Sequence, residues 1–560
     1  MKNKIAVFVF ISTLLLFSCG SKKDAVSPPA TDTKKNPVLN SITLNGATLS
    51  AVLFNTSLTP KIKASFSEPI KSTTLQAITL TDNNGTNISY TTTLSNGDSV
   101  INIQPSANLK YLTKYNLTVS AVLQSASGGN LQTPVTGAFV TVLDSSRKFP
   151  AINDEALLDT VQKRTLKYFW DFAHPVSGLV REGSKHDAKI VTSGGSGFGV
   201  MALLVAADRG FKTKAEVLTR LQTIVSFLKN TAQTFHGAYP HWLDGGTGAV
   251  IPFSDNDNGA DLVETSYLIQ GLLCARQYFN GAAAEEVKLR EDINTIADKV
   301  EWEWFRQNNQ DVLYWHWSPD KAWVMNLKIQ GWNECLITYL LAASSKNHSI
   351  SKTVYDDGWA RNGAMKNSKT FYNYTLPLGQ DYGGPLFFSH YSFMGLNPKG
   401  LSDAYANYET QTKNHTLINY SYCKANPANY FGYSDSVWGL TASNIKNGYT
   451  ASSPTNDRGF IAPTAALSSM PYTPQQSMAA LKFYYYVLGD KLFKEYGFVD
   501  AFSLNEVKNG EPWFDDAFLA IDQGPVMVMI ENYRSGLLWD LFMSCPEVKS
   551  GLTKLGFSGF

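Results

Sequence analysis

The stretch SDNDNGADLVETSYLIQGLLCARQYF, from Ser254 to Phe279, carries the strongest indication of fold and function in this chain. It places Asp257, Asp261 and Glu264 at the entry to a long apolar helix. If the helix already includes Asp257, the three side chains share one face, because residues three and four apart are neighbours on a helix. If the helix starts near Gly259, Asp257 lies in the entering loop and the other two lie in the first turn.

Acidic residues also suit helix N-termini, where the helix dipole and the free N–H groups stabilise negative charge. That explanation is sufficient for a single carboxylate. Three carboxylates in one short segment, preceded by Asp255 and followed by aromatic residues, favour a site for proton transfer instead. Asp257, Asp261 and Glu264 are therefore candidate catalytic residues.

Outward from this helix, the chain after Ser145 has repeated helical apolar spacing. Roughly ten to twelve helices, with no strand runs between them, are expected in the last 400 or so residues. An (α/α)6 toroid spanning 150–560 closes that many helical hairpins around a central pocket. A helical solenoid is the alternative, but no regular repeat of about 34 or 40 residues is present. The predicted fold class is thus mainly α.

The preceding segment, 37–145, has a different pattern. Short alternating runs rich in Thr, Ser, Val and Ile are separated by Asn-Gly and Gly-Gly turns. Strands at this spacing predict a small all-β sandwich. The runs ASFSEPI, TLTDNNG and YNLTVSAVLQSASGGNL resemble bacterial Ig-like domains, which implies a spacer or a support close to carbohydrate.

The N-terminal residues predict where in the cell the protein is located. Lys2 and Lys4 precede an apolar run that is too short to span a bilayer, as in a signal peptide covering 1–19. The run ends in Leu-Phe-Ser-Cys, which resembles a lipobox with Cys19 as the lipidated residue. Residues 20–36 read as a flexible tether. We expect an outer-membrane lipoprotein that faces the periplasm or the cell surface.

The amino-acid composition limits the classes of molecule that the protein is expected to bind. The length of 560 residues suggests two or three domains. The 48 Lys+Arg and 47 Asp+Glu nearly cancel, so the net charge does not indicate binding to nucleic acid. Aromatic residues make up 12%, which supplies many rings able to stack on sugars. The remaining cysteines, Cys274, Cys335, Cys423 and Cys545, are too widely spaced for a metal or redox motif and read as buried free thiols, with a disulfide open. We expect a monomer.

Two further acids precede apolar helices. Glu334 lies in IQGWNEC, where a charge on an inner helix face needs a function. Asp522 lies in AIDQGP, and Pro525 is expected to open a helix that runs to Met543. Asp522 could equally be an N-terminal cap.

Motifs for cofactors are absent. The DNDNG run at 255–259 has Gly259 and Ser266 at the fifth and twelfth positions of the EF-hand frame, which excludes that calcium loop. The glycine run at 194–199 lacks the dinucleotide spacing and is not G-x-S-x-G. It suits close helix entry with backbone N–H groups facing a pocket. We predict no metal and no cofactor.

Several long motifs, in order, resemble the bacterial glucoamylase-like family, and within it glycoside hydrolase family 144, the β-1,2-glucanases. The resemblance covers about 150–560 and rests on YFWDFAHPVSGL, SGGSGFGVMALLVAADRG, NGADLVETSYLIQGLL, the GWNE run, GPLFFSHYSFMGLNP, the segment from Tyr433 to Ser443, NDRGFIAPTAALSSMPY and AIDQGPVMVMIENYRSGLLW. It implies an (α/α)6 barrel that hydrolyses β-1,2-glucan with inversion and without a metal, releasing sophorose or short sophoro-oligosaccharides. The family's essential acids fall on Asp257, Asp261, Glu264, Glu334 and Asp522.

An inverting hydrolase needs an acid and a base roughly 6.5–9.5 Å apart. Neighbours at i,i+3 on a helix have Cβ atoms only about 5–6 Å apart, so Asp261 and Glu264 are a poor couple by themselves. We assign Glu334 as general acid and Asp522 as base, acting directly or through a bridging hydroxyl, with Asp257 as the alternative base.

Aromatic residues and one histidine near these acids are candidates for sugar subsites: Trp242, Trp317, Trp332, His390 and Tyr391. Two other classes stay open. A glycan-binding lipoprotein without catalysis would use the same rings but would not need acids from three segments. A toroid hydrolase or lyase acting on another polysaccharide is the second, and a lyase would need a Tyr or His base and cationic residues.

Overall fold

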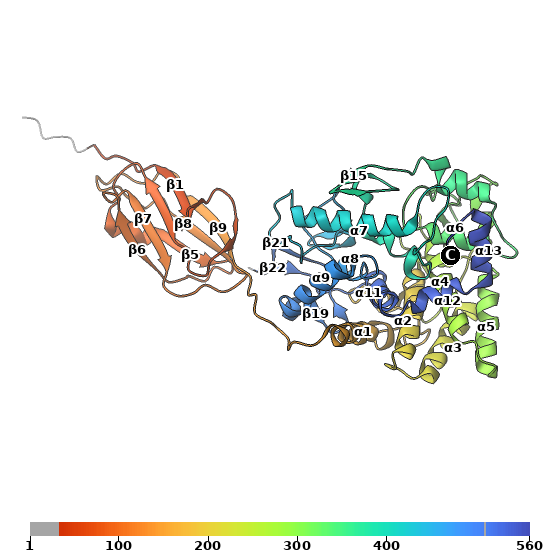
Figure 1. The fold of residues 1–560 in the computed structure, drawn as a ribbon. Coiled ribbons are helices and arrows are strands. Elements are labelled where there is room, and N and C mark those ends of the chain that lie inside the picture. Colours follow the sequence, from red (N-terminus) through yellow and green to blue (C-terminus); the bar gives the residue numbers. More distant parts are fainter. Residues whose placement is uncertain (1–32, 509–510) are drawn as a thin grey trace, which may run out of the picture.

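The computed structural model describes residues 33–508 and 511–560 as an N-terminal β-sandwich followed by a larger helical domain (Figure 1). A segment without regular structure joins the last strand of the sandwich to the first helix. The predicted signal peptide, Cys19 and most of the tether lie outside the described residues. No helix in the described part of the chain is long and apolar enough to cross a membrane.

In the strands of the sandwich, buried and exposed side chains alternate. In β4, for example, Ile62, Ala64 and Phe66 face the core and Lys63 faces solvent. One sheet has the order β2-β1-β4-β7-β6, and the other has β3-β9-β8-β5 with β3 parallel to β9. The strands are β1 (Leu39–Leu44), β2 (Ala47–Thr48), β3 (Leu53–Thr56), β4 (Ile62–Phe66), β5 (Ile78–Asp82), β6 (Tyr90–Ser95), β7 (Val100–Pro105), β8 (Lys114–Val119) and β9 (Val135–Thr141).

The second domain has its own large apolar core. Its helices are α1 (Asp154–Trp170), α2 (Ser193–Asp208), α3 (Lys214–Asn230), α4 (Leu262–Tyr278), α5 (Ala284–Ala297), α6 (Leu336–Ser344), α7 (Tyr408–Ala425), α8 (Pro463–Leu467), α9 (Pro474–Tyr486), α10 (Gly489–Leu492), α11 (Ala520–Arg534), α12 (Leu537–Met543) and α13 (Pro546–Leu555).

The prediction of helices without intervening strands was wrong. Short antiparallel pairs connect the helices and line their ends, because long polar and aromatic loops satisfy their backbone groups by pairing. These strands are β10 (Ile190–Thr192), β11 (Trp242–Asp244), β12 (Val250–Ile251), β13 (Ala260–Asp261), β14 (His316–Trp317), β15 (Thr370–Phe371), β16 (Tyr374–Thr375), β17 (Ala442–Ile445), β18 (Gly448–Ala451), β19 (Phe493–Lys494), β20 (Gly497–Phe498), β21 (Phe502–Lys508) and β22 (Glu511–Phe514).

Helices α2, α4 and α11 are buried almost all round, as expected for helices at the centre of a domain. Glycines allow α2 and α4 to pack closely: a Cβ at Gly197 would collide with the carbonyl of Tyr267, and one at Gly271 would collide with that of Gly197. The glycine run at the start of α2 therefore serves close helix packing, as predicted.

Two helix starts differ from the predictions. Helix α4 begins at Leu262, because the short pair β13 and β14 keeps Ala260 and Asp261 extended. Asp257 lies in the preceding loop, as the second alternative predicted, but Asp261 is the N-cap and only Glu264 lies in the first turn. Helix α11 begins at Ala520, so Pro525 lies inside it, and a separate helix, α12, ends at Met543. The earlier start of α11 puts Asp522 in its first turn.

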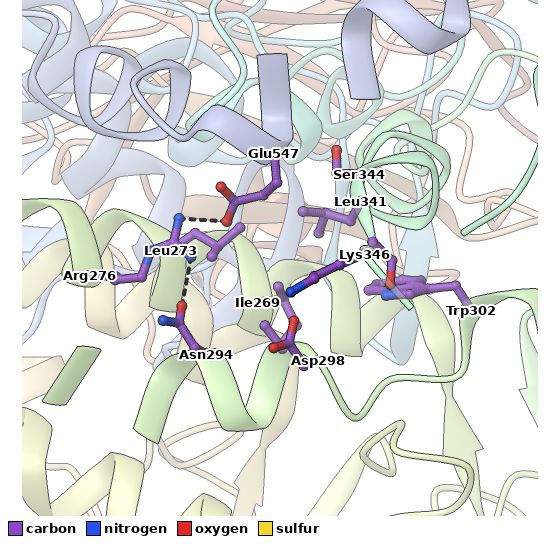
Figure 2. A pocket seen from close by; sticks show the side chains of 12 residues that line it. Ile269, Leu273, Arg276, Asn294, Asp298, Trp302, Leu341, Ser344, Lys346 and Glu547 are labelled. Atoms are coloured by element: carbon purple, nitrogen blue, oxygen red, sulfur yellow. Dashed lines mark hydrogen bonds and ion pairs between the residues drawn. The ribbon is translucent and has the colours of Figure 1, made fainter. Parts of the chain in front are cut away.

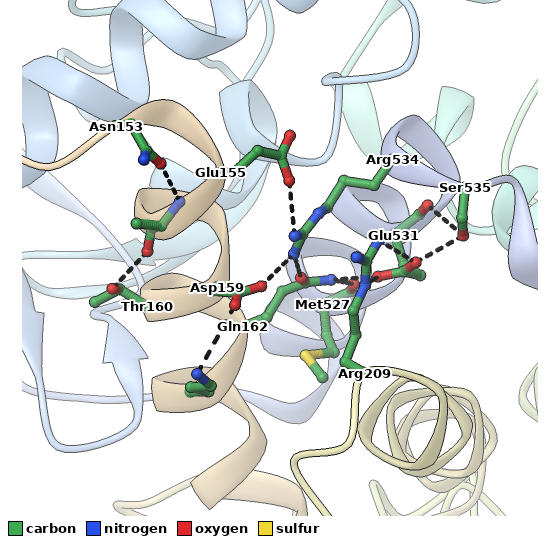
Figure 3. A network of polar contacts seen from close by, with 12 residues as sticks. Asn153, Glu155, Asp159, Thr160, Gln162, Arg209, Met527, Glu531, Arg534 and Ser535 are labelled. Atoms are coloured by element: carbon green, nitrogen blue, oxygen red, sulfur yellow. Dashed lines mark hydrogen bonds and ion pairs between the residues drawn. The ribbon is translucent and has the colours of Figure 1, made fainter.

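A polar network centred on the buried Glu531 fixes the C-terminal half of α11 against α1 and α2 (Figure 3). Arg209 donates from Nε and Nη2 to the two oxygens of Glu531 at 2.8 and 2.7 Å, and Gln162 donates to Glu531 at 3.1 Å. Arg534 joins the same region to Asp159 and Glu155 of α1. The cysteines Cys274, Cys335, Cys423 and Cys545 are buried free thiols, as predicted.

Candidate active site

A cavity of about 500 Å³ lies where the N-terminal ends of α2, α4, α6 and α11 meet. Its wall includes Thr192, the N-cap of α2, and Glu264 in the first turn of α4. Glu334 immediately precedes α6, and Leu519 and Ile521 start α11. Because helix N-termini carry partial positive charge, this convergence suits negatively charged groups.

Two glutamates from the predicted set face the cavity. Glu264 accepts a hydrogen bond from the backbone N–H of Gly194 at 3.0 Å, and a side chain at Gly194 would collide with its carboxylate. Burial raises the pKa of Glu264 to about 8, while the charge of His241 acts in the opposite direction. Burial also raises the pKa of Glu334 to about 7. Both side chains can therefore hold a proton near neutral pH.

Asp261 lies behind Glu264 and has a structural and an electrostatic role. Its Oδ1 accepts from the N–H groups of Val263 and Glu264 at 3.0 and 2.9 Å, which caps α4. Its Oδ2 lies 3.2 Å from Nδ1 of His241 and 3.5 Å from Nε2 of His316. Although burial opposes ionisation, these two histidines lower the pKa of Asp261. Asp261 is consequently a buried anion.

The strand pair β13 and β14 explains this geometry. Asp261 pairs with His316 and Ala260 with Trp317, so alternation along the strand turns His316 toward the acids and Trp317 to the other face. Asp257, in the loop before β13, lies 3.4 Å from Nε2 of the same His316. Burial and the charge of Asp261 raise the pKa of Asp257 to about 6.

His241, Asp257 and Asp261 also form a possible cation site. Their ligand atoms lie within 4.8 Å of one another. Carboxylate and imidazole ligands suit a divalent metal, but the contacts of Asp261 with the two histidines are equally those of hydrogen-bonded ion pairs. The prediction of no metal stays a prediction, and no step below depends on one.

Asp522 lies behind the part of the cavity wall formed by Leu519 and Ile521. It is 2% exposed, and the ionisable group that acts on it most strongly is another acid, Asp500, which is 1% exposed. Burial and the charge of Asp500 raise the pKa of Asp522 well above its ordinary value. Thr464 donates to its backbone carbonyl at 2.8 Å and anchors this first turn.

Aromatic side chains complete the wall. Trp242 and Tyr391 from the predicted set line the cavity, and Phe253 and Tyr449 do so while remaining 47% and 54% exposed. The indole N–H of Trp242 is buried and finds no hydrogen-bond acceptor within the described residues. Exposed rings and a free donor beside carboxyls are features of a sugar-binding site.

Three predicted subsite residues lie outside the cavity lining. Trp317 packs at 5.4 Å from Trp304 in an aromatic cluster. Trp332 is buried against Phe393, and His390 is buried with Nε2 3.0 Å from the hydroxyl of Ser469. Their predicted contact with substrate stays a prediction.

Several cavity residues were missed by the sequence analysis. His241 and Glu182 belong to short loops, and Asn444 and Tyr449 belong to the hairpin of β17 and β18. The Pro-His-Trp run at 240–242 was a usable signal for His241, because a histidine beside a predicted sugar-binding tryptophan is a candidate for the same site. Glu182, Asn444 and Tyr449 had no such signal in the sequence.

A second cavity, of about 250 Å³, lies at the opposite end of α4 (Figure 2). Its prominent charged group, Arg276, is satisfied by Glu547 at 2.5 Å and by Asn294 at 2.8 Å. Arg276, at the end of α4, joins this helix to α5 and α13 through these two partners, which is a packing role. We do not assign this cavity a function.

Fold and site place the chain in a known class: it belongs to the glucoamylase-like family and carries a bacterial Ig-like domain in front. The family model described as "Putative glucoamylase" matches residues 326–546, and the model described as "Bacterial Ig-like domain" matches residues 32–141.

Three relatives have informative names. An endo-β-1,2-glucanase from Chitinophaga pinensis, solved with sophorotriose and glucose, is 52% identical with a TM-score of 0.70, over 73% of this chain and 99% of that one. A β-1,2-glucanase structure from Parabacteroides distasonis is 37% identical with a TM-score of 0.70, over 93% of this chain and 73% of that one.

The third is a curated protein of Parabacteroides distasonis, an exo β-1,2-glucooligosaccharide sophorohydrolase acting at the non-reducing end. It is 45% identical over 432 residues, which are 73% of this chain. This chain spans 59% of the length of that relative.

Proposed function

We propose that this protein is a glycoside hydrolase that cleaves β-1,2-glucan. The observation that carries the proposal is the cavity itself: it joins two glutamates able to hold a proton near neutral pH, Glu264 and Glu334, to exposed aromatic rings. A binding protein without catalysis would have no reason to bury carboxyls at such a cost. The β-1,2 linkage comes from the relatives.

The proposed architecture of the second domain is an (α/α)6 toroid. Helices buried on all sides alternate along the chain with helices that keep a polar face: α2, α4, α6, α8 and α11 are buried, whereas α1, α3, α5, α7 and α9 are partly exposed. Alternation of inner and outer helices is what a double ring requires, and four of the five buried helices, α2, α4, α6 and α11, have their N-terminal ends at one cavity.

In the proposed mechanism, Glu334 is the general acid. Its proton goes to the glycosidic oxygen as the bond from that oxygen to the anomeric carbon breaks. A water attacks the anomeric carbon from the opposite face and gives its proton to Asp522, directly or through a bridging hydroxyl, so the configuration inverts. Asp261 and the histidines around it hold negative charge in place beside Glu264. With a pKa of about 7 for Glu334, activity should fall as the pH rises through 7.

The product profile on β-1,2-glucan tests the function, with laminarin and starch as control substrates. We expect sophorose or short sophoro-oligosaccharides from β-1,2-glucan alone, and an α-anomer as the first product in the proton NMR spectrum. Release of sophorose alone from the start would indicate exo action, and a ladder of lengths would indicate endo action. Cleavage of starch but not of β-1,2-glucan would refute the proposal.

An unsaturated product absorbing near 230 nm is the outcome expected of a lyase acting by β-elimination. Its appearance on any polysaccharide would exclude hydrolysis as the reaction. Neutral glucan cannot give such a product without a uronate, so the absorbance measurement separates the two classes directly.

We also propose that the protein is a monomeric outer-membrane lipoprotein anchored at Cys19. The lipobox pattern that ends at Cys19 supports this location. A Cys19→Ala variant should lose the lipid label and leave the membrane fraction, whereas a variant with Ser21→Ala should keep both. Retention of the Cys19→Ala variant in the outer membrane would contradict the proposal.

A further inference from the structure

Two carboxyl groups meet in the wall behind the cavity, and no cation accompanies them. Asp500 follows β20 and Asp522 lies in the first turn of α11, and each is almost fully buried. In the described part of the chain, neither forms an ion pair with a lysine, arginine or histidine. Oδ1 of Asp500 and Oδ2 of Asp522 have no other hydrogen-bond partner. Two adjacent buried carboxylates cannot both be ionised at low cost.

The hydrogen bonds around the pair are unequal. Oδ2 of Asp500 accepts from the backbone N–H of Asn444 at 2.6 Å, which stabilises a negative charge on Asp500. The carboxyl of Asp522 contacts Asp500 but accepts no backbone N–H of this kind from the described residues, and Thr464 donates to its backbone carbonyl instead. A proton shared by the two acids is therefore favoured on Asp522.

We propose that Asp500 is a positioning residue that shares a single proton with Asp522 and so sets the pH above which Asp522 can accept a proton from water. The inference rests on the proposed function, in which Asp522 is the base. Asn444 lines the cavity, which links the state of the pair to the wall that a substrate touches.

The other groups that face the pair do not supply a compensating charge. Glu182 and Asp515 are acids that act on Asp522 and Asp500, respectively. Three tyrosines also interact with Asp522, namely Tyr168, Tyr391 and Tyr449, and Tyr449 interacts with Asp500 as well. Burial and then neighbouring acids raise the pKa of the Tyr168 and Tyr391 hydroxyls well above the ordinary value. The acidic neighbours favour retention of the proton and the neutral tyrosines supply no positive charge, so Asp522 loses its proton at a higher pH than an ordinary aspartate.

The test is the pH profile of kcat/KM on β-1,2-glucan for Asp500→Asn. An amide removes the like charge and can donate to Asp522, so the pKa of Asp522 should fall. We expect the acidic limb of the profile to move to lower pH by about one unit or more. A limb that stays in place, or that moves to higher pH, would overturn the inference. A merely structural role of Asp500 would lower activity at every pH without moving the limb.

Asp515→Asn is the matched control. Asp515 accepts from the side chain of the same Asn444 at 2.8 Å, so the variant removes one negative charge and one contact of that asparagine. Its acidic limb should move much less than that of Asp500→Asn. An equal shift in both variants would mean that Asn444, and not the shared proton, controls the profile.

A spectroscopic measurement does not depend on activity. Infrared difference spectra of the unaltered protein and Asp522→Asn at pH 5, which is above the ordinary aspartate pKa of about 3.9, should show the loss of one protonated carboxyl band. Absence of that band would overturn the inference even if Asp500→Asn fails to fold. If the unaltered protein does not cleave β-1,2-glucan, the proposed function fails, whereas the infrared band still reports on the pair.

Discussion

Helix α11 buries a carboxylate near each end, and the two have opposite surroundings. Near the C-terminal end, Glu531 accepts hydrogen bonds from Nε and Nη2 of Arg209, and although burial acts against ionisation, its pKa is lowered. Near the N-terminal end, Asp522 faces Asp500 and its pKa is raised. Both side chains are equally hidden from solvent, so the partner decides the charge state.

The difference separates structural from functional acids. A buried carboxylate with a matched arginine stabilises packing when both partners are present. A buried carboxyl that lies beside a cavity without a cation lowers the stability of the fold. Such a group is typical of a catalytic site. Glu334 belongs with Asp522 by this criterion. The pKa of Glu264 is also raised, although the charge of His241 acts in the opposite direction. The contrast predicts that one group of substitutions lowers activity and the other lowers stability.

The largest effect is expected for Glu334→Gln. An amide keeps the shape but cannot donate an acidic proton, so kcat on β-1,2-glucan should fall by about 10²–10⁴-fold with little change in melting temperature. The deficit should shrink on a substrate with a nitrophenolate leaving group, if the cavity accepts one. Glu285→Gln, at an exposed position in α5, is the control and should have no effect on kcat. Near-normal kcat in Glu334→Gln would shift the role of acid to the cluster from Asp257 to Glu264.

The opposite behaviour is expected at the other end of α11. Arg209→Met leaves Glu531 buried without its cation and should lower the free energy of unfolding by about 3–5 kcal/mol. Below the unfolding transition, kcat should stay the same. The double variant with Glu531→Leu should recover most of the stability, because an apolar pair has no charge to desolvate. Chemical denaturation followed by circular dichroism measures all three, and a double variant no more stable than Arg209→Met would contradict this explanation.

A smaller effect, with a defined pH dependence, is expected for Glu264→Gln. The folded-state pKa of about 8 is higher than the usual glutamate value of about 4.3, so the folded protein binds the proton more tightly. Stability should therefore fall as the pH rises from about 4 to 8. Glu264→Gln removes this loss, and its advantage over the unaltered protein should grow by up to about 1.4 kcal/mol per pH unit over this range. Melting curves at several pH values measure it, and a constant difference across pH would show that Glu264 is not the group responsible.

The smallest effect concerns two tryptophans that the sequence could not tell apart. Trp242→Ala removes a ring from the cavity wall and should lower kcat/KM by about 2- to 10-fold, the equivalent of about 0.5–1.5 kcal/mol. Trp317→Ala removes a ring from the neighbouring aromatic cluster and should lower stability while leaving KM unchanged. Initial-rate kinetics on sophoro-oligosaccharides distinguish them. A raised KM in Trp317→Ala alone would place the subsite on the other face of β14.

Much of the organisation could be predicted from the sequence because it depends on local pattern. Period-two alternation in runs such as Ile62–Phe66 identified the sandwich, and helical spacing after Ser145 identified the helices. The short strand pairs were missed because segments of two or three residues, such as Ala260–Asp261, are too short to show a period. The start of α11 was missed because Pro525 is tolerated within the helix, where Gly524 also packs closely on Phe198.

The sequence by itself determined that acids gather at the starts of apolar helices and that aromatic rings follow them. Only the tertiary structure decided which acids are ionised, because that depends on partners far away along the chain: His241 and His316 for Asp261, and Arg209 for Glu531. It also decided which rings face the acids, since one strand turns His316 toward Asp257 and Asp261 and turns Trp317 to the opposite side. Charge state and orientation are properties of contacts between distant segments, and no local pattern encodes them.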